Sequence, residues 1–98
     1  MTYFIEFSED AERHLDQLRA YDRSIVIAAI KEQLRHEPAV PTRHRVRLRD
    51  TPLASWELRV GDFRIFYNVE EERVTVLIVA VGEKDRNIVR IEGREFSL

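Results

Sequence analysis

The stretch 56–67 constrains the fold more than any other part of the sequence. Apolar and polar residues alternate through 56–60 and again through 63–67, which is the period of a β-strand with one buried face. Gly61 and Asp62 separate the two runs, and glycine readily takes the positive φ that a two-residue hairpin turn needs at its first position. The sequence therefore predicts a tight antiparallel β-hairpin whose register is fixed by its turn.

That register sets two arginines opposite each other. Arg59 faces Arg64 on one side of the hairpin, while the other side is apolar and pairs Trp56 with Tyr67, two predicted core or interface residues. Directly opposed like charges are destabilising, so the arginine pair needs a compensating negative charge. One candidate is Glu57, which lies diagonal to Arg64 on the same face. The other is a bound phosphate, which accepts paired hydrogen bonds from arginine.

The first half of the chain predicts one strand and two helices. Residues 3–7 are rich in strand-forming side chains. Apolar residues at helical spacing indicate a first helix over about 9–19. We expect a second helix capped by Asp22, which should stop by Glu37 because Pro38 disfavours helical geometry in the residue before it.

The second half predicts loop and strand. The stretch 38–54 should be mostly loop, with a possible short edge strand where Val46 and Leu48 alternate with arginines. Residues 73–81 are apolar on both faces, which is typical of a central buried strand. The charged tail, 82–98, should add one short strand or a helix. The tail can pack back on the sheet through three apolar residues, Ile91, Phe96 and Leu98.

Together these elements predict one domain, residues 1–98, of the α+β class. Its expected architecture is an N-terminal strand and a two-helix hairpin packed on a twisted, mostly antiparallel sheet of four to five strands. We find no internal repeat and no linker in the sequence.

Composition narrows the functional classes. The chain has no cysteine, which excludes disulfides and thiolate chemistry and fits a reducing compartment. No apolar run reaches the roughly 18 residues of a spanning helix, and the first ten residues do not look like a secretory signal. We therefore expect a cytoplasmic protein without membrane contact. The net charge of −2 argues against a general nucleic-acid binder, and the histidine spacing does not suggest a metal site.

Charge is nevertheless unevenly distributed along the chain. The segment 43–49 carries four arginines and no acid, and such a basic strip can attract an anion even on a slightly acidic molecule. It is either a solvated loop or a contact for RNA or for an acidic partner segment. Within it, His44 is the one histidine that we would test as an acid or base. His14, on the first predicted helix, is expected to be a plain surface residue.

The stretch 56–82 reads WELRVGDFRIFYNVEEERVTVLIVAVG. A strand ending in Leu-Arg-Val-Gly is followed by Asp-Phe-Arg, an aromatic strand, an acidic turn and an apolar strand ending in Val-Gly. In this order the motifs resemble the RelE/ParE toxins of type II toxin-antitoxin systems, and the resemblance covers nearly the whole chain. It implies two helices on a twisted antiparallel sheet. It also implies a partner, an antitoxin that wraps around the toxin in a hetero-oligomer.

The resemblance implies one of two activities, because the fold alone does not settle function. RelE-like members enter the ribosomal A site and cut mRNA, whereas ParE-like members poison DNA gyrase. We favour a ribosome-dependent mRNA endonuclease, an mRNA interferase that contacts ribosome and mRNA and uses no metal or other cofactor. The alternatives are a gyrase inhibitor and a non-catalytic relic that still binds its antitoxin.

The resemblance also assigns candidate site residues. Arg64 matches the hairpin arginine that binds phosphate in RelE-like enzymes, and Arg59 matches a basic position in the strand before it. Lys84 or Arg86 can replace a later arginine, and Arg90 stands where the family has a tyrosine. The catalytic candidates are thus Arg64, Lys84, Arg86 and Arg90, and the candidates for binding phosphate or RNA are Arg59, Arg43, Arg45, Arg47 and Arg49.

Two departures from the family pattern leave the question of catalysis open. Ser55 and Glu57 stand where some members have lysines. Arg90 replaces the tyrosine, and an arginine stays protonated and is a poor general base. Any catalysis would then depend on charge stabilisation by the basic residues.

Overall fold

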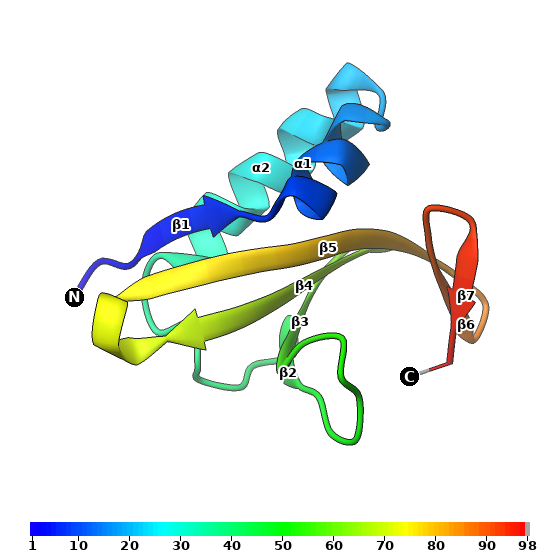
Figure 1. Ribbon diagram of the computed structural model, residues 1–98. Coiled ribbons are helices and arrows are strands. Elements are labelled where there is room, and N and C mark those ends of the chain that lie inside the picture. Colours follow the sequence, from blue (N-terminus) through cyan, green and yellow to red (C-terminus); the bar gives the residue numbers. More distant parts are fainter. Residues whose placement is uncertain (98) are drawn as a thin grey trace.

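The computed structural model describes residues 1–97 and places two helices over one face of a twisted sheet (Figure 1). The elements in chain order are β1 (Phe4–Phe7), α1 (Glu9–Asp16), α2 (Ala20–Leu34), β2 (Arg45–Arg47), β3 (Trp56–Val60), β4 (Phe63–Glu70), the 3-10 helix η1 (Glu71–Arg73), β5 (Thr75–Asp85), β6 (Ile88–Ile91) and β7 (Arg94–Phe96). The α+β prediction is confirmed.

The sheet is larger than predicted. Within residues 1–97 it has seven strands in the order β2-β3-β4-β5-β6-β7, and β1 pairs in parallel with the first part of β5. The predicted number of four to five strands was too low, because β5 continues to Asp85 and the tail then forms the β6–β7 hairpin. All the other pairings are antiparallel.

The central hairpin, β3–β4, has the predicted register. Trp56 faces Tyr67 and Arg59 faces Arg64, with Val60 opposite Phe63 at the turn. Gly61 has a φ of 56°, in the left-handed region that favours glycine. This is the positive φ that was predicted for the first position of the hairpin turn.

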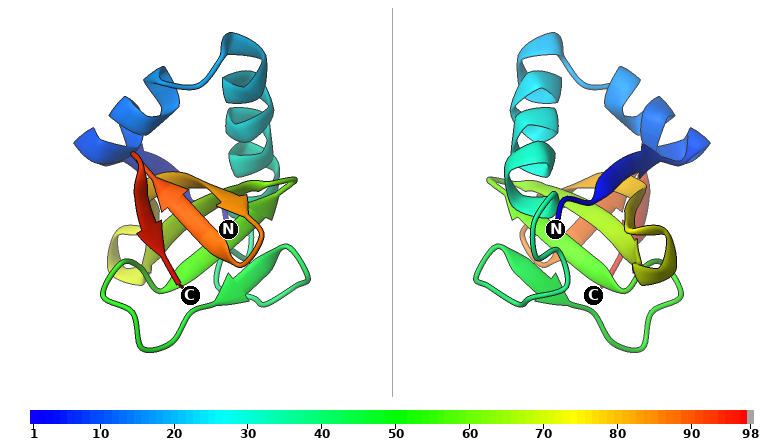
Figure 2. Two further views of the ribbon diagram at one scale, coloured as in Figure 1. Left: turned by 90° about the vertical axis from the view of Figure 1, so that its right-hand side faces the viewer. Right: turned by 90° about the vertical axis from the view of Figure 1, so that its left-hand side faces the viewer.

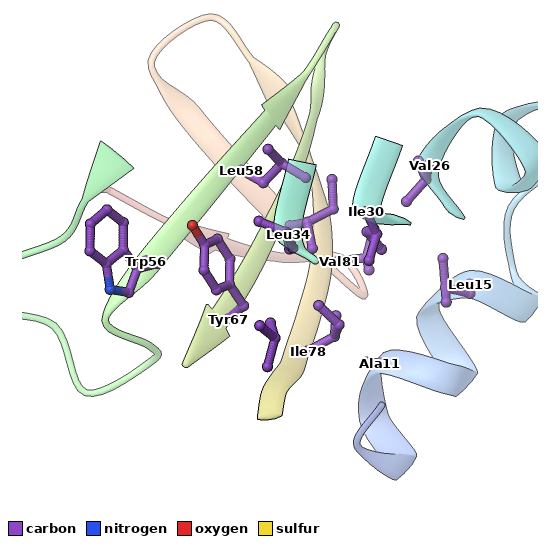
Figure 3. Close-up of a cluster of buried hydrophobic side chains, with 12 residues drawn as sticks. Ala11, Leu15, Val26, Ile30, Leu34, Trp56, Leu58, Tyr67, Ile78 and Val81 are labelled. Atoms are coloured by element: carbon purple, nitrogen blue, oxygen red, sulfur yellow. The ribbon is translucent and has the colours of Figure 1, made fainter. Parts of the chain in front are cut away.

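The main core lies between the helices and the sheet (Figure 3). Side chains from α1 and α2, among them Leu15 and Ile30, pack on the apolar face of the β3–β4 hairpin and on β5. Tyr67 is fully buried, and its hydroxyl donates a hydrogen bond of 2.7 Å to the Pro38 carbonyl oxygen. Its ring stacks on that of Trp56 with 6.1 Å between centroids. Both aromatics are core residues, as predicted.

The two helices differ from the prediction at their ends. The backbone N–H of Ala11 donates to the Ser8 hydroxyl at 3.0 Å, which caps α1, but α1 already ends at Asp16. The prediction that Asp22 caps the second helix is wrong. α2 begins at Ala20 after Arg19, and Asp22 lies in its first turn, 3.3 Å from the Arg19 guanidinium. Within residues 1–97, neither helix is long and apolar enough to cross a membrane.

A second, smaller core lies on the opposite face of the sheet, where the loop between β2 and β3 and the β6–β7 hairpin approach each other (Figure 2). Phe66 is fully buried there, against residues that include Val89 and Ile91. Phe96 packs at its edge. The tail therefore packs back on the sheet through Ile91 and Phe96 as predicted, while Leu98 lies outside the described residues.

His14 is buried, so the prediction of a surface residue is wrong. Its side chain is only 5% exposed. Nδ1 accepts a hydrogen bond of 3.1 Å from the backbone N–H of Val81, and Nε2 lies 3.1 Å from a Glu92 oxygen. The histidine is buried because the β5 strand and the turn after β6 both pack against α1.

Candidate functional site

A basic groove of about 860 Å³ lies on the face of the sheet away from the helices. It runs between the segment 46–51 and the strand β6, over the polar face of the central hairpin. Five basic and two acidic residues are among those that line it, so the groove is locally positive on a molecule whose net charge is −2. The charged lining residues are Arg47, Arg49, Asp50, Glu57, Arg59, Arg64 and Lys84.

Strand pairing brings three of these cations together. Arg59 lies opposite Arg64 across the hairpin, and Arg64 in turn lies opposite Gly82 on β5. Lys84, two residues beyond Gly82, returns to the same face because side chains alternate along a strand. Its backbone N–H donates a hydrogen bond of 2.7 Å to the Asp62 carbonyl oxygen, which holds the end of β5 against the hairpin turn.

The Arg64 guanidinium is fastened to that turn. The residue is only 8% exposed, and Nη1 donates hydrogen bonds to the carbonyl oxygens of Gly61 at 2.7 Å and Phe63 at 2.9 Å. These contacts fix the orientation of the guanidinium without neutralising its charge. A cation that is positioned in advance in a concave site is well suited to bind an anionic group.

Glu57 supplies the negative charge expected beside the arginine pair, but it pairs with Arg59 and not with Arg64. Nε of Arg59 donates a hydrogen bond of 2.8 Å to a Glu57 oxygen. Arg64 thus has no carboxylate partner within residues 1–97, and its charge is balanced only by backbone dipoles.

One comparison decides the family of this chain. The model of the family described as the ParE toxin of the type II toxin-antitoxin system, parDE, matches residues 5–88. The chain belongs to the RelE/ParE toxin family.

The relatives of this RelE/ParE toxin match it over most of its length. It is 30% identical to the mRNA interferase toxin RelE of Escherichia coli K12 over 94 residues, which covers 95% of both chains. Its structure resembles that of the toxin-antitoxin complex RelBE2 from Mycobacterium tuberculosis, with a TM-score of 0.75 and 26% identity, over 86% of this chain and 93% of the other. The isolated E. coli RelE toxin gives a TM-score of 0.69 at 26% identity, over 86% of each chain.

The four arginines of the predicted basic strip, residues 43–49, make different contacts in this RelE/ParE toxin. Arg49 lines the groove. Arg47 borders it, yet its guanidinium lies over the Trp56 ring at 5.5 Å from the centroid. Arg45 donates hydrogen bonds to the carbonyl oxygens of Gln33 and Val40 and so ties β2 to the end of α2. Arg43 is exposed and is absent from the groove lining, as is His44.

The later cations of this toxin are also separated from one another. Lys84 lines the groove, but Arg86 is exposed in the turn before β6 and is not among the lining residues. Arg90 lies opposite Glu95 on β7 and forms ion pairs with Glu95 and Asp85. Its neighbour in β6, Val89, lines the groove. Because side chains alternate along a strand, Arg90 lies on the other side of β6. The catalytic roles predicted for these three residues stay predictions. The structure places only Lys84 beside Arg64.

The uncharged polar residues of the groove were not predicted from the sequence. Asn87, Thr51 and Ser97 line it, and each can exchange hydrogen bonds with a ligand. Asn87 follows Arg86 at the tip of the β5–β6 connection, where Arg86 has a φ of 60°. Asp85 and Asn87 are turn-favouring residues between two strand-forming runs, and this signal could have placed Asn87 in a turn. Among residues 1–97 no cluster of three or more His, Asp or Glu could hold a metal ion.

A second hollow of about 650 Å³ lies on the helix side, between α1, α2 and β1. Its lining is largely apolar and includes Phe4, a residue that is 72% exposed, together with Phe7 and Ile27. The arginine and lysine cluster described above is not part of it. Three basic and two acidic residues also line this hollow, against five basic and two acidic residues in the basic groove, so the excess of positive charge is larger in the groove.

Proposed function

We propose that this protein is the toxin of a type II toxin-antitoxin pair and acts as an mRNA interferase that cuts mRNA on the ribosome. The observation that carries the proposal is the convergence of Arg59, Arg64 and Lys84 in one groove. The E. coli relative named as an mRNA interferase toxin matches over 95% of this chain, which supports the same activity here.

The groove suits the charge changes of RNA cleavage. A phosphodiester that is attacked by the neighbouring 2′-OH gains negative charge on its non-bridging oxygens, and prepositioned cations stabilise that charge. Arg64 is held in place for this task by the turn carbonyls, and Lys84 adds a point charge from the adjacent strand. No cofactor is needed for this reaction, in which the RNA supplies its own nucleophile.

We further propose that the full chain, residues 1–98, acts as one cytoplasmic domain that is held inactive by an antitoxin. The M. tuberculosis relative was solved as a toxin-antitoxin complex, which supports a hetero-oligomer here. The apolar hollow on the helix side is the natural surface for an apolar antitoxin segment, because it exposes Phe4 to solvent.

A gyrase inhibitor is the second candidate function, and two observations favour it. The matching family model carries the ParE name, and within residues 1–97 the groove lining includes neither histidine nor tyrosine. Expression of a gyrase inhibitor would induce DNA-damage signalling and accumulate gyrase cleavage complexes. An mRNA interferase would instead generate new mRNA ends within codons.

Induced expression with mapping of mRNA ends distinguishes these functions. We expect rapid growth arrest, with cuts in translated mRNA. The double variant Arg64→Ala and Lys84→Ala should lose both effects, because two of the three converging cations are gone. Arg19→Ala is the matched control, since Arg19 is a highly exposed arginine on the helix side. Arrest without mRNA cuts, accompanied by trapped gyrase, would favour the second candidate, and an unaffected culture would reject both.

A further inference from the structure

The turn between β6 and β7 is tied to the helix layer through one side chain (Figure 2). Glu92 accepts hydrogen bonds of 2.7 Å from both Nε and Nη2 of Arg13 on α1, one on each carboxylate oxygen. Nε2 of His14 lies 3.1 Å from the same carboxylate, and Nε2 of Gln17 donates to it at 3.3 Å. Within residues 1–97, Glu92 is the only residue of the β6–β7 hairpin whose side chain bonds to the helix layer. We call these contacts of Glu92 the Glu92 clamp.

The backbone at Glu92 is unfavourable for a glutamate. Glu92 has a φ of 51° and Gly93 has a φ of 79°, so both residues of this two-residue turn are in the left-handed region. The first position of such a turn favours asparagine, aspartate or glycine. Glutamate differs from these in the length of its stem, which brings two carboxylate oxygens to the Arg13 guanidinium. The residue at position 92 therefore suits the contact with α1 better than it suits the turn.

The hairpin that the clamp holds is part of the groove wall. Val89 in β6, Asn87 just before β6 and Ser97 just after β7 all line the basic groove. Lys84 lies opposite Val89 in the β5–β6 pairing, so the position of β6 also sets the surroundings of that cation. Glu92 itself is not among the lining residues. It acts on the groove through the position of β6 and β7.

We propose that Glu92 is a positioning residue for mRNA cleavage, an inference that rests on the proposed function. Its bonds to α1 hold β6, and with it one wall of the basic groove, in the place that the bound RNA requires. A segment near the end of a chain is well ordered only where it is tied down. Position is critical for such a reaction, because a displacement of about 1 Å far from the chemistry can lower a rate by about 10²-fold.

A merely structural role for the clamp would have different consequences, because it would only add to global stability. Far below the unfolding midpoint nearly all molecules are folded with or without the clamp, so a loss of stability alone leaves the cleavage rate unchanged. A loss of position instead slows cleavage by folded molecules and changes the orientation of β6 relative to the rest of the sheet.

Glu92→Gln keeps the length of the side chain and removes its charge, so it weakens the clamp. Single-turnover cleavage of ribosome-bound mRNA is measured at saturating toxin, well below the unfolding midpoint of each variant. We expect the rate to fall by about tenfold. The toxin concentration that gives half the maximal rate should change by less than about threefold, because the cations that bind RNA are retained.

A second readout does not depend on cleavage. Residual dipolar couplings of backbone N–H groups report the orientation of each strand in the folded protein. In the wild type, we expect the couplings of all strands to fit one common geometry. In Glu92→Gln the couplings of β6 and β7 should depart from it, while those of β3 and β4 still fit.

Glu6→Gln is the matched control. Glu6 accepts a hydrogen bond of 2.7 Å from Nη2 of Arg73, so this variant makes the same chemical change at another exposed arginine contact. Glu6 is not among the lining residues of the groove. The variant should cut at the wild-type rate.

Glu92→Asn separates the clamp from the turn. Asparagine is favoured at this position of the turn, yet its side chain is one methylene too short for the paired contact with Arg13. The variant should therefore fold even if Glu92→Gln does not, and it should still cut about tenfold more slowly than the wild type. A role of Glu92 confined to the turn would leave Glu92→Asn as active as the wild type.

Arg13→Ala removes the other half of the clamp, from a helix that does not line the groove. It should slow cleavage by a similar factor. Adding it to Glu92→Gln should slow cleavage little further, since both changes remove the same contact. Losses that simply multiply would mean that the two residues act independently, which would overturn the clamp.

Failure of this inference differs from failure of the proposed function. A wild type that cuts no mRNA overturns the proposed function, and with it the role of Glu92 in cleavage, whereas altered β6 couplings in Glu92→Gln would still establish the clamp. A wild type that cuts, alongside a folded Glu92→Gln variant that cuts equally fast, overturns the positioning role alone. Unchanged β6 couplings in a slow variant would also overturn it, since the wall would then not have moved.

Discussion

The backbone N–H of Val81 donates a hydrogen bond of 3.1 Å to Nδ1 of His14. Because Nδ1 is the acceptor, the proton of the neutral ring is on Nε2, which lies 3.1 Å from a Glu92 oxygen. One buried side chain thus joins α1, the middle of the central strand β5 and the turn between β6 and β7. Since β6 forms one wall of the basic groove, contacts on the helix side hold that wall in position.

Replacing His14 should therefore destabilise the fold. In His14→Leu the buried N–H of Val81 loses its acceptor, and leaving a buried donor unsatisfied costs about 1–3 kcal/mol. Urea unfolding at neutral pH measures the loss. His44→Leu is the control, because His44 is exposed, and its effect should stay within about 0.5 kcal/mol. Equal stabilities of the two variants would mean that the bond to Val81 contributes nothing.

Glu92 is the residue that Nε2 of His14 contacts. Nε and Nη2 of Arg13 each donate a hydrogen bond of 2.7 Å to one of its oxygens. These bonds from Arg13, assisted by His14 and Gln17, outweigh desolvation and lower the pKa of the Glu92 carboxyl from 4.5 to about 2. The carboxylate is therefore more stable in the folded protein than in the unfolded chain.

That shift predicts how stability depends on pH. The folded pKa is the lower one, so the unfolded state binds the proton first as pH falls. The contribution of Glu92 is fully present above about pH 4.5 and is lost as pH falls through about 2. Glu92→Gln should thus be less stable at neutral pH, and its free energy of unfolding should change less with pH over that window. Unfolding in urea at a series of pH values tests this, with the exposed Glu72→Gln as control.

The sequence predicted the central hairpin well because its determinants are local. The alternation through 56–67 and the two-residue turn at Gly61 specify the register, and all the predicted pairs form. His14 was mispredicted because its environment is not local. Its hydrogen-bond donor, Val81, is 67 residues away in the sequence, and no helical periodicity on α1 reports that contact.

The candidate site was predictable where it depends on strand pairing, and it was not predictable where it depends on the packing of the tail. Strand pairing brings Arg59, Arg64 and Lys84 together. The hairpin register predicted the Arg59–Arg64 pair, whereas Lys84 was named through the family resemblance. Arg90 was named by its alignment with a family tyrosine, which carries no information on the hairpin that the tail forms here. Glu57 was considered only as a partner for charge, because its burial depends on the folded groove.

The placement of Arg90 predicts an unequal effect of two charge deletions. Lys84→Ala removes a cation from the groove and should lower the cleavage rate by at least about tenfold, a loss of about 1.4 kcal/mol in transition-state stabilisation. Arg90→Ala removes the same charge on the other side of β6, where Asp85 and Glu95 neutralise it, and should leave cleavage within about threefold of the wild type. Single-turnover rates on ribosome-bound mRNA measure both. A rate for Arg90→Ala as low as that for Lys84→Ala would place Arg90 in the reaction after all.

Gly82 allows β6 to cross close to the central strand. A Cβ at this position would lie 2.7 Å from the carbonyl oxygen of Arg90 and 2.8 Å from Cγ1 of Ile91. Since the nearer contact is with backbone, β6 itself would have to move in Gly82→Ala, and overpacking of this kind costs about 1–3 kcal/mol. We expect lower stability in urea and slower cleavage together, because Val89 and Asn87 would shift with the groove wall. Lower stability with an unchanged cleavage rate would show that the position of β6 does not limit the reaction.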